Sequence, residues 1–444
     1  MSDVRAGQHG PDAMPLPFDA KHLRSGDLLL AVRINNLPHI EAVYGRSVSA
    51  ATAGEVQDAI ARWVPGTQAH RAGEIIIEAA VPLLSRNREL APATLIESLC
   101  IGLMTQPLLL DGEKLHVSVS VGYALIPEDG APLQALSALL EQCHNMLQAS
   151  WSAPDFIAAW DGNWLAGYRA DMAAAATLLH RIDRGETFFV WQPVRRTAES
   201  GVSLYHEALL RTSSKDGQHI SCGQAIQSLE RIGLARILDR YSASAILDQL
   251  EDDPIACVGV NISAQSASFH LNGKDALWNE LRTRLAEDRS LGPRLVVEIT
   301  ESSPAASQKD LTEFIAFLRA MGCRIAIDDF GAGHNGLRQL LVLTPDIVKL
   351  DSFFISGTGQ SEQRRRTFHH VLGLAQSLAP MVVVEGVESA ALEEIAREEG
   401  AIWLQGYHMG HPSVVRSWED ATYSDSIQAL LAFKGRFKQP SNGQ

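Results

Sequence analysis

The feature that most constrains the fold is a series of eight short apolar runs, most of them separated by helical segments, from residue 187 onward. The runs are TFFVWQPV, SLYHEALLR, ACVGVNIS, RLVVEITE, RIAIDDF, DIVKLD, MVVVEGVE and AIWLQGY. Most are continuously apolar, as expected for strands that are covered on both faces. Strand–helix alternation at this spacing predicts an α/β fold, a (β/α)8 TIM-like barrel. The first connection, VRRTAESGVSLY, is too short for a helix, so we expect a hairpin and one antiparallel strand.

Most of these runs end in a polar residue that could hold a metal ion. In a parallel barrel such positions converge on one mouth, the face where barrel active sites lie. The residues are Glu207, Asn261, Glu298, Asp328, Asp329, Lys349, Asp351, Glu385 and Gln405.

Carboxylates gathered at one mouth repel each other and lose hydration, and stability alone gives no reason to build such a cluster. Two bound divalent cations would cancel the charge. Oxygen ligands suit Mg²⁺ or Mn²⁺ rather than zinc. Two such ions, roughly 3.5–4 Å apart, form a template for hydrolysing a phosphate ester.

Each residue alone also has a structural explanation. An aspartate at a strand end commonly caps a helix, and a single lysine such as Lys349 is commonly a surface or ion-pair residue. Glu301 and Glu388 could simply favour the N-terminus of a following helix. The agreement of seven strand ends favours the functional interpretation.

Together these residues resemble the EAL-domain family of cyclic-di-GMP phosphodiesterases over about residues 178–415. The motifs that carry the resemblance are Glu207-Ala208-Leu209, Asn261-Ile262-Ser263, Glu298-Ile299-Thr300-Glu301, Asp328-Asp329-Phe330-Gly331, Lys349-Leu350-Asp351, Glu385-Gly386-Val387-Glu388 and Gln405-Gly406-Tyr407. Their order and their spacing both agree with the family.

The resemblance implies catalytic and metal-binding roles for these positions. Glu207, Asn261, Glu298 and Asp328 would hold one cation, and Asp328 with Asp329 would engage the second. Lys349 would orient the attacking water and offset phosphate charge. Glu385 would either hold a metal-bound water or act as the base, and Gln405 would complete the site by hydrogen bonding.

The resemblance also implies a substrate-binding set. Arg211 would contact a substrate phosphate, for which a planar guanidinium is well suited. Gln192, Leu209 and Asp351 would line the same cleft. Glu301 would anchor the loop that follows Asp329.

One loop departs from the family. The usual Asp-Phe-Gly-Thr-Gly-Tyr-Ser-Ser-Leu reads DFGAGHNGL here, so Ala332, His334, Asn335 and Gly336 replace Thr, Tyr, Ser and Ser. The family's loop couples the metal site to the dimer interface. Loss of its hydroxyls removes hydrogen bonds, and Gly336 adds backbone freedom. Because the metal ligands are retained, we expect activity with an altered rate or regulation.

The first half has strand-like runs and helical segments that predict a smaller α+β domain, and it resembles a degenerate GGDEF (diguanylate cyclase) domain. Arg33 and Asn35 stand where the family has metal-binding aspartates, and the signature hairpin reads RAGEII at 71–76. A positive charge at Arg33 cannot bind Mg²⁺. We therefore expect no cyclase activity and a regulatory role, through dimerisation, GTP or a protein regulator.

These resemblances predict a flexible tail at 1–25, a GGDEF-like domain at 26–165, the start of a linker helix at 166–177, an EAL domain at 178–430 and a tail at 431–444. A formal net charge of -14 argues against DNA binding. Five scattered cysteines, no signal peptide and no membrane span predict a cytoplasmic protein.

Two functions from different classes fit these observations. The first is hydrolysis of cyclic-di-GMP to pGpG by water activated by two cations, Mg²⁺ or Mn²⁺, in a homodimer formed through the EAL domain. The alternative is a non-catalytic cyclic-di-GMP receptor that signals to a protein partner. Receptors of this kind generally lose metal ligands, and this chain retains them all, which favours the enzyme.

Overall fold

The computed structural model describes residues 18–19, 23–83, 91–127, 133–148, 162–197, 199–214, 216–268, 275–300, 307–331, 341–416 and 418. The chain divides into two compact units, Met1–Arg169 and Ala170–Gln444, and each is described here by itself. Helix α5 (Gly162–Asp183) runs through the boundary between them.

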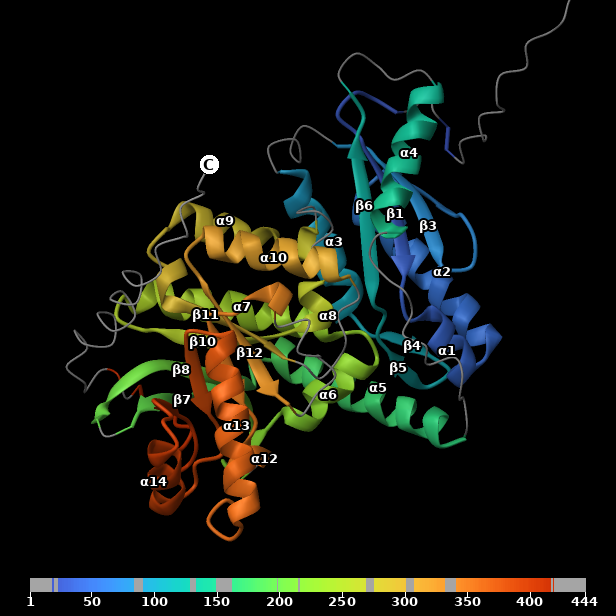
Figure 1. Cartoon of the computed structure of the whole chain (residues 1–444). Helices are drawn as coiled ribbons and strands as arrows, with labels where there is room; N and C mark the ends of the chain where they lie inside the picture. Colours follow the sequence, from blue (N-terminus) through green and yellow to red (C-terminus); the bar gives the residue numbers. More distant parts are fainter. Residues whose placement is uncertain are drawn as a thin grey trace, which may run out of the picture. The chain divides into compact units, whose positions relative to one another are not determined.

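The first unit is built on an antiparallel sheet in the order β2-β3-β1-β6 (Figure 1). Its central strand is the apolar run LLLAVRI, and helix α4 packs on it through a buried cluster that includes Leu29, Leu140 and Cys143. The α+β fold predicted for this half is confirmed. The strands are β1 (Leu28–Ile34), β2 (Gln68–Arg71), β3 (Ile76–Val81), β4 (Leu108–Leu110), β5 (Glu113–Leu115) and β6 (Val119–Leu125), with β4 and β5 in a separate ribbon; the helices are α1 (Leu37–Tyr44), α2 (Arg46–Trp63), α3 (Pro92–Thr105) and α4 (Leu133–Gln148).

The second unit is a closed barrel of eight strands, β7, β8 and β10 to β15, and β9 extends the sheet beyond β8. Pairing of β8 with β10, at His206 with Val258 and Glu207 with Gly259, closes the barrel. Strand β7 runs antiparallel to both of its neighbours, as the short first connection predicted. The strands are β7 (Thr187–Arg196), β8 (Glu199–Ser213), β9 (His219–Ser221), β10 (Val258–Ser263), β11 (Leu295–Thr300), β12 (Arg324–Phe330), β13 (Ile347–Leu350), β14 (Met381–Val384) and β15 (Trp403–Leu404).

Helices cover the outside of the barrel, as Figure 1 shows for α7, α10 and α13. Outward-facing strand residues such as Val297 and Ile325 form one large core with helix residues such as Phe314 and Leu372. The helices are α6 (Gly223–Arg231), α7 (Ala235–Asp252), α8 (Ala264–Ala267), η4 (Ala276–Trp278), α9 (Asn279–Glu287), η5 (Gly292–Arg294), α10 (Gln308–Ala320), α12 (Ser352–Ile355), α13 (Glu362–Leu378) and α14 (Ala390–Glu398).

The inside of the barrel is arranged in two layers. An apolar floor is formed by a buried cluster of Val194, Leu204, Tyr205, Cys257, Val296, Ala326, Ile347, Met381, Val383 and Trp403. Because strand side chains alternate between faces, the residue two positions along points inward again. At that next position Val296 is followed by Glu298, Ala326 by Asp328 and Ile347 by Lys349. The polar mouth therefore lies directly on the apolar floor.

Gly259 on β10 is required where this floor meets the mouth. A Cβ atom at this position would lie 2.2 Å from Glu298 Oε1 and 2.6 Å from Tyr205 Cε2. Any side chain at Gly259 would therefore displace either a residue of the polar mouth or the ring below it.

We predict that Gly259→Ala lowers the free energy of unfolding by about 1–3 kcal/mol, the usual cost of overpacking. The control is Gly373→Ala on α13, where no atom lies within 4 Å of the added methyl and helix propensity should stabilise by about 0.5–1 kcal/mol. Urea unfolding of both variants measures the difference. A Gly259→Ala protein as stable as wild type would contradict the packing argument.

Candidate metal and active site

The centre of the mouth is the ammonium group of Lys349, on β13. Its Nζ lies 3.1 Å from Glu207 Oε2, 2.6 Å from Glu298 Oε2, 2.8 Å from Asp328 Oδ1 and 2.9 Å from Glu385 Oε1. Lys349 is 1% exposed and Glu298 is fully buried. Four carboxylates from four neighbouring segments thus surround a single positive charge.

One ammonium cannot neutralise four carboxylates, and the pKa values of the acids diverge as a result. Burial raises the pKa of Glu298 well above its ordinary value, and it also raises the pKa of Asp328 and brings that of Glu385 to about 8. For Glu207, burial is outweighed by Lys349 and by hydrogen bonds from Gln405 and Asn261, so its pKa is lowered. Burial alone would lower the pKa of Lys349, yet the four carboxylates raise it well above its usual range.

Two amides orient Glu207. Asn261 Nδ2 donates to Glu207 Oε1 at 2.7 Å, and Gln405 Nε2 donates to Glu207 Oε2 at 2.6 Å. Gln405 Nε2 also reaches Gln192 Oε1 at 3.5 Å. Glu207, Asn261, Gln405 and Gln192 are therefore brought together across the mouth.

Three acceptor oxygens of this group are buried without a hydrogen-bond donor: Asn261 Oδ1, Glu298 Oε1 and Gln405 Oε1. A buried acceptor without a partner costs about 1–3 kcal/mol. Such oxygens, next to excess negative charge, are suited to a hard divalent cation. The residues present therefore fit a metal site.

The carboxylates form two potential ligand groups that share Asp328. In the first, atoms of Glu207, Glu298 and Asp328 lie within 4.8 Å of one another, and in the second the same holds for Asp328, Asp329 and Glu385. A shared aspartate between two groups is the arrangement that two neighbouring cations would need.

Strand β12 departs from regular geometry where it supplies two consecutive aspartates. In a regular strand, adjacent side chains point to opposite faces. Here the pairing with β13 shifts register between Ile327 and Phe330, and Asp329 adopts φ 54°. This left-handed residue turns its side chain back to the mouth, so Asp328 and Asp329 serve one site. Burial and the charge of Asp328 raise the pKa of Asp329 to about 6.

The predicted substrate residues are distributed around the mouth. Leu209 and Arg211 line a hollow of about 210 Å³ together with Asn261, and Arg211 Nη1 donates to Leu210 O at 2.9 Å. Asp351 is the N-cap of α12, with Oδ1 accepting from Phe353 N at 2.7 Å, so it already has a structural role. Glu301 and the loop at 332–340 lie outside the described residues.

Sequence reasoning missed one buried residue close to these ligands. Asp239, on α7, accepts hydrogen bonds from Ser263, which ends the strand that carries Asn261. The Asn261-Ile262-Ser263 motif marked the serine, but it gave no indication of a partner on a helix.

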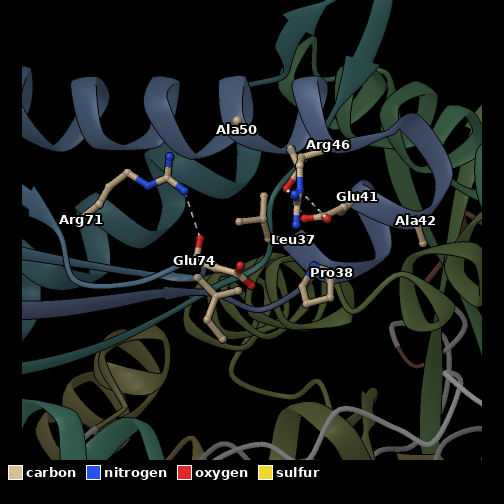
Figure 2. A pocket seen from close by; sticks show the side chains of 10 residues that line it. Leu37, Pro38, Glu41, Ala42, Arg46, Ala50, Arg71 and Glu74 are labelled. Carbon is tan, nitrogen blue, oxygen red and sulfur yellow. Dashed lines mark hydrogen bonds and ion pairs between the residues drawn. The ribbon is translucent and has the colours of Figure 1, made fainter.

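The first unit has a hollow of about 780 Å³ beside α1, α2 and the β2–β3 hairpin. Figure 2 shows its charged lining, in which Arg46 Nε lies 3.5 Å from Glu41 Oε1 and Arg71 Nη2 donates to Glu74 O at 3.4 Å. In the described parts of this unit, no group of three potential metal ligands is found.

Arg33 and Asn35, at the positions expected to have lost a metal-binding function, pair with each other. Arg33 Nε donates to Asn35 Oδ1 at 3.2 Å. Asn35 Nδ2 then donates to Ser118 Oγ at 3.2 Å and to Ser120 Oγ at 3.0 Å. The polar groups at this position thus form an internal hydrogen-bonded network.

The chain belongs to the EAL-domain family, because residues 175–412 match the EAL domain. It is 26% identical over 334 residues to the bifunctional diguanylate cyclase/cyclic di-GMP phosphodiesterase MucR of Pseudomonas aeruginosa, covering 74% of this chain and 48% of MucR. It is 25% identical over 312 residues to the cyclic di-GMP phosphodiesterase PdeF of Escherichia coli, covering 68% of this chain and 40% of PdeF. The chain thus spans less than half the length of these curated relatives.

Among solved structures, the S helix-GGDEF-EAL segment of LapD from Vibrio cholerae matches with a TM-score of 0.47 and 17% identity, over 87% of this chain and 89% of that one. Among the helices of the described chain, none combines the length and apolar character that a membrane crossing requires.

The divergent pKa values predict a pH-dependent stability. The folded state holds the proton of Glu385 with a pKa of about 8, against an ordinary value of 4.5. The folded state therefore binds this proton more tightly than the unfolded state does. In EDTA, this group should make the free energy of unfolding fall as pH rises from about 5 to about 8.

Thermal unfolding of wild type and Glu385→Gln, both in EDTA, measures this effect. The glutamine cannot ionise, so the variant should show a smaller fall in midpoint between about pH 5 and about pH 8. Parallel pH curves for the two proteins would contradict the assignment of the raised pKa to Glu385.

Proposed function

We propose that this chain is a metal-dependent phosphodiesterase that hydrolyses cyclic-di-GMP to pGpG. The observation that carries the proposal is the cluster of four carboxylates around Lys349, with buried acceptor oxygens that lack donors. Membership of the EAL-domain family and the names of MucR and PdeF support this substrate.

In this proposal Glu207, Asn261, Glu298 and Asp328 hold one cation, and Asp328, Asp329 and Glu385 hold the other. The two cations, Mg²⁺ or Mn²⁺, would supply Lewis-acid activation of the phosphodiester and of water when bound.

The chain's own residues orient the reaction. Lys349 Nζ fixes the carboxylates relative to each other and offsets charge on the substrate phosphate. Glu385 Oε1 holds the attacking water or takes its proton. Gln405 and Gln192 position Glu207, and Arg211 binds the second phosphate from the hollow beside Leu209. The apolar floor excludes water from below.

We further propose that residues 26–165 form a GGDEF-like regulatory domain without cyclase activity, joined at 166–177 to an EAL domain at 178–430. The hydrogen-bonded network at Arg33 and Asn35 supports the loss of cyclase chemistry. GTP or a protein would act on this domain, and the EAL domain would form a homodimer. Five buried free thiols support a reducing, cytoplasmic location.

Asp328→Asn should lower turnover of cyclic-di-GMP by at least about 100-fold, since even outer partners of metal ligands cost 10–100-fold. The control is Asp346→Asn, which lies before β13, at the end opposite to Lys349. The carboxylate of Asp346 accepts a 2.9 Å hydrogen bond from Ile325 N, outside the mouth. Chromatographic detection of pGpG with Mn²⁺, with and without EDTA, measures both variants.

Near-normal turnover by Asp328→Asn would overturn the metal assignment. Tight cyclic-di-GMP binding by wild type without any pGpG would instead identify the chain as a receptor.

The full chain supplied with GTP and Mg²⁺ should form no cyclic-di-GMP, because a guanidinium at Arg33 repels the cation that the triphosphate needs. To prevent hydrolysis of any product, the assay uses the Asp328→Asn variant, and an active diguanylate cyclase serves as the positive control. Accumulation of cyclic-di-GMP would show that the first unit retains the chemistry.

A further inference from the structure

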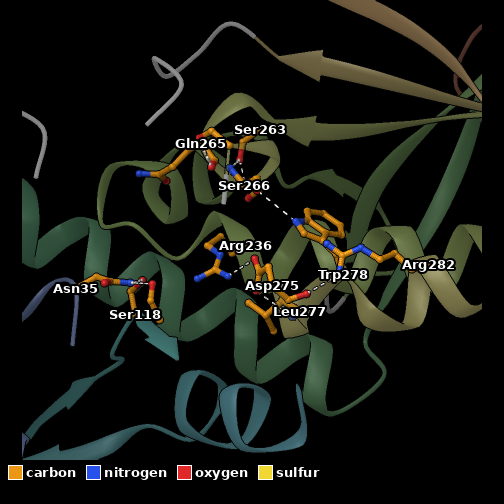
Figure 3. A network of polar contacts seen from close by, with 12 residues as sticks. Asn35, Ser118, Arg236, Ser263, Gln265, Ser266, Asp275, Leu277, Trp278 and Arg282 are labelled. Carbon is orange, nitrogen blue, oxygen red and sulfur yellow. Dashed lines mark hydrogen bonds and ion pairs between the residues drawn. The ribbon is translucent and has the colours of Figure 1, made fainter. Parts of the chain in front are cut away.

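Helix α7 has a buried carboxylate and a buried guanidinium, three residues apart, that contact the end of β10 and the start of η4. Asp239 and Arg236 are 7% and 3% exposed. Arg236 Nη2 donates to Asp275 Oδ2 at 2.5 Å, and Asp275 Oδ1 accepts from Leu277 N at 3.1 Å (Figure 3). Arg236 thus holds the start of η4, while Asp239 holds the end of β10.

Asp239 contacts the last residue of β10. Its Oδ2 accepts from Ser263 N at 3.0 Å and from Ser263 Oγ at 2.7 Å. Ser263 Oγ also accepts from Ser266 N at 3.1 Å, which makes Ser263 the N-cap of α8, and it bonds Ser266 Oγ at 2.9 Å (Figure 3). The backbone of Ser263 is therefore held from both sides of the turn that leaves the strand.

The carboxylate of Asp239 accepts a hydrogen bond at the point where strand pairing ends. Strand β8 pairs with β10 only as far as Gly259, and β11 continues alongside β10 to Ser263. The N–H of Ser263 donates to Asp239 rather than to a neighbouring strand. A side chain on a helix thus completes the hydrogen bonding of the end of β10.

Asn261 lies two residues before Ser263 and depends on this geometry. Its Nδ2 is committed to Glu207, so the position of its free Oδ1 is set by the backbone of β10. Asn261 Nδ2 lies 2.7 Å from Glu207 Oε1, so a small movement of the strand end would shift Oδ1 relative to the carboxylate of Glu207.

We propose that Asp239 is a positioning residue for Asn261, which it aligns for cation binding by fixing the end of β10 through Ser263. This inference rests on the proposed metal-dependent function. A purely stabilising role for Asp239 predicts a loss of fold stability without a change in the affinity for the cation, so the two roles are separable.

The test is calorimetric titration of the full chain with Mn²⁺, without substrate, together with thermal unfolding in EDTA. Asp239→Ala should weaken Mn²⁺ binding by about tenfold, the lower end for outer partners of metal ligands. Asp239→Asn retains an oxygen that can accept from Ser263, and its affinity should stay within about threefold of wild type. Ser263→Ala, which keeps the backbone bond to Asp239, should fall between them and replaces Asp239→Ala if that protein does not fold.

The matched control is Asp253→Ala, at the C-cap of α7, where the connection to β10 begins. Asp253 is also 7% exposed and accepts from Trp418 Nε1 at 2.8 Å and from Ile255 N at 3.1 Å. It should lower the unfolding midpoint without changing Mn²⁺ affinity.

Wild-type affinity in Asp239→Ala and Ser263→Ala would overturn the proposal, as would equal losses in Asp239→Ala and Asp253→Ala. If wild type binds no Mn²⁺, both this inference and the metal-dependent function are wrong. If wild type and variants bind as expected but no pGpG forms, only the proposed hydrolysis fails.

Discussion

The four contacts of Lys349 are the interaction on which the interior of the barrel depends. An ammonium buried to this degree is tolerable only beside carboxylates, and buried carboxylates are tolerable only beside a cation. Lys349 satisfies this need in part, since one positive charge faces Glu207, Glu298, Asp328 and Glu385. Burial, together with the remaining negative charge, raises the pKa values of Glu298, Asp328 and Glu385. Further cations are the simplest way for the folded chain to ionise all four acids together.

The backbone makes this concentration of charge possible. On β11, β12 and β13 an inward apolar residue in one layer is followed by a polar residue in the next. The mouth is therefore desolvated from below by the floor of residues such as Val296 and Trp403. Strand β12 adds a fifth acid, Asp329, to the four around Lys349 by breaking its own alternation. A left-handed non-glycine residue costs of order 1–3 kcal/mol, and it persists where the surrounding structure demands it. The strained residue, Asp329, belongs to the same potential ligand group as Asp328 and Glu385.

Much of this could be predicted from the sequence, because strand ends in register converge whatever the details of packing. The barrel, its antiparallel strand and the acids of the mouth follow from apolar runs and their terminal residues. Which of those acids keeps its proton could not be predicted. Whether Glu207 or Glu298 keeps its proton depends on donors from Asn261 and Gln405, which lie far from Glu207 in the sequence. The cap that Asp351 provides is local and could be anticipated from its place at a strand end. The contact of Asp239 with Ser263 joins residues 24 positions apart, and no local pattern encodes it.

The two units differ in how their buried polar groups are satisfied. In the first unit Asn35 is bonded to Ser118 and Ser120, and Asn36 donates to His116 O and accepts from Ser118 N. These polar groups thus use one another as hydrogen-bond partners. In the barrel, Asn261 and Gln405 use their N–H groups on Glu207 and leave their oxygens without donors. An unsatisfied buried acceptor is costly, and a bound cation would complete several of them together.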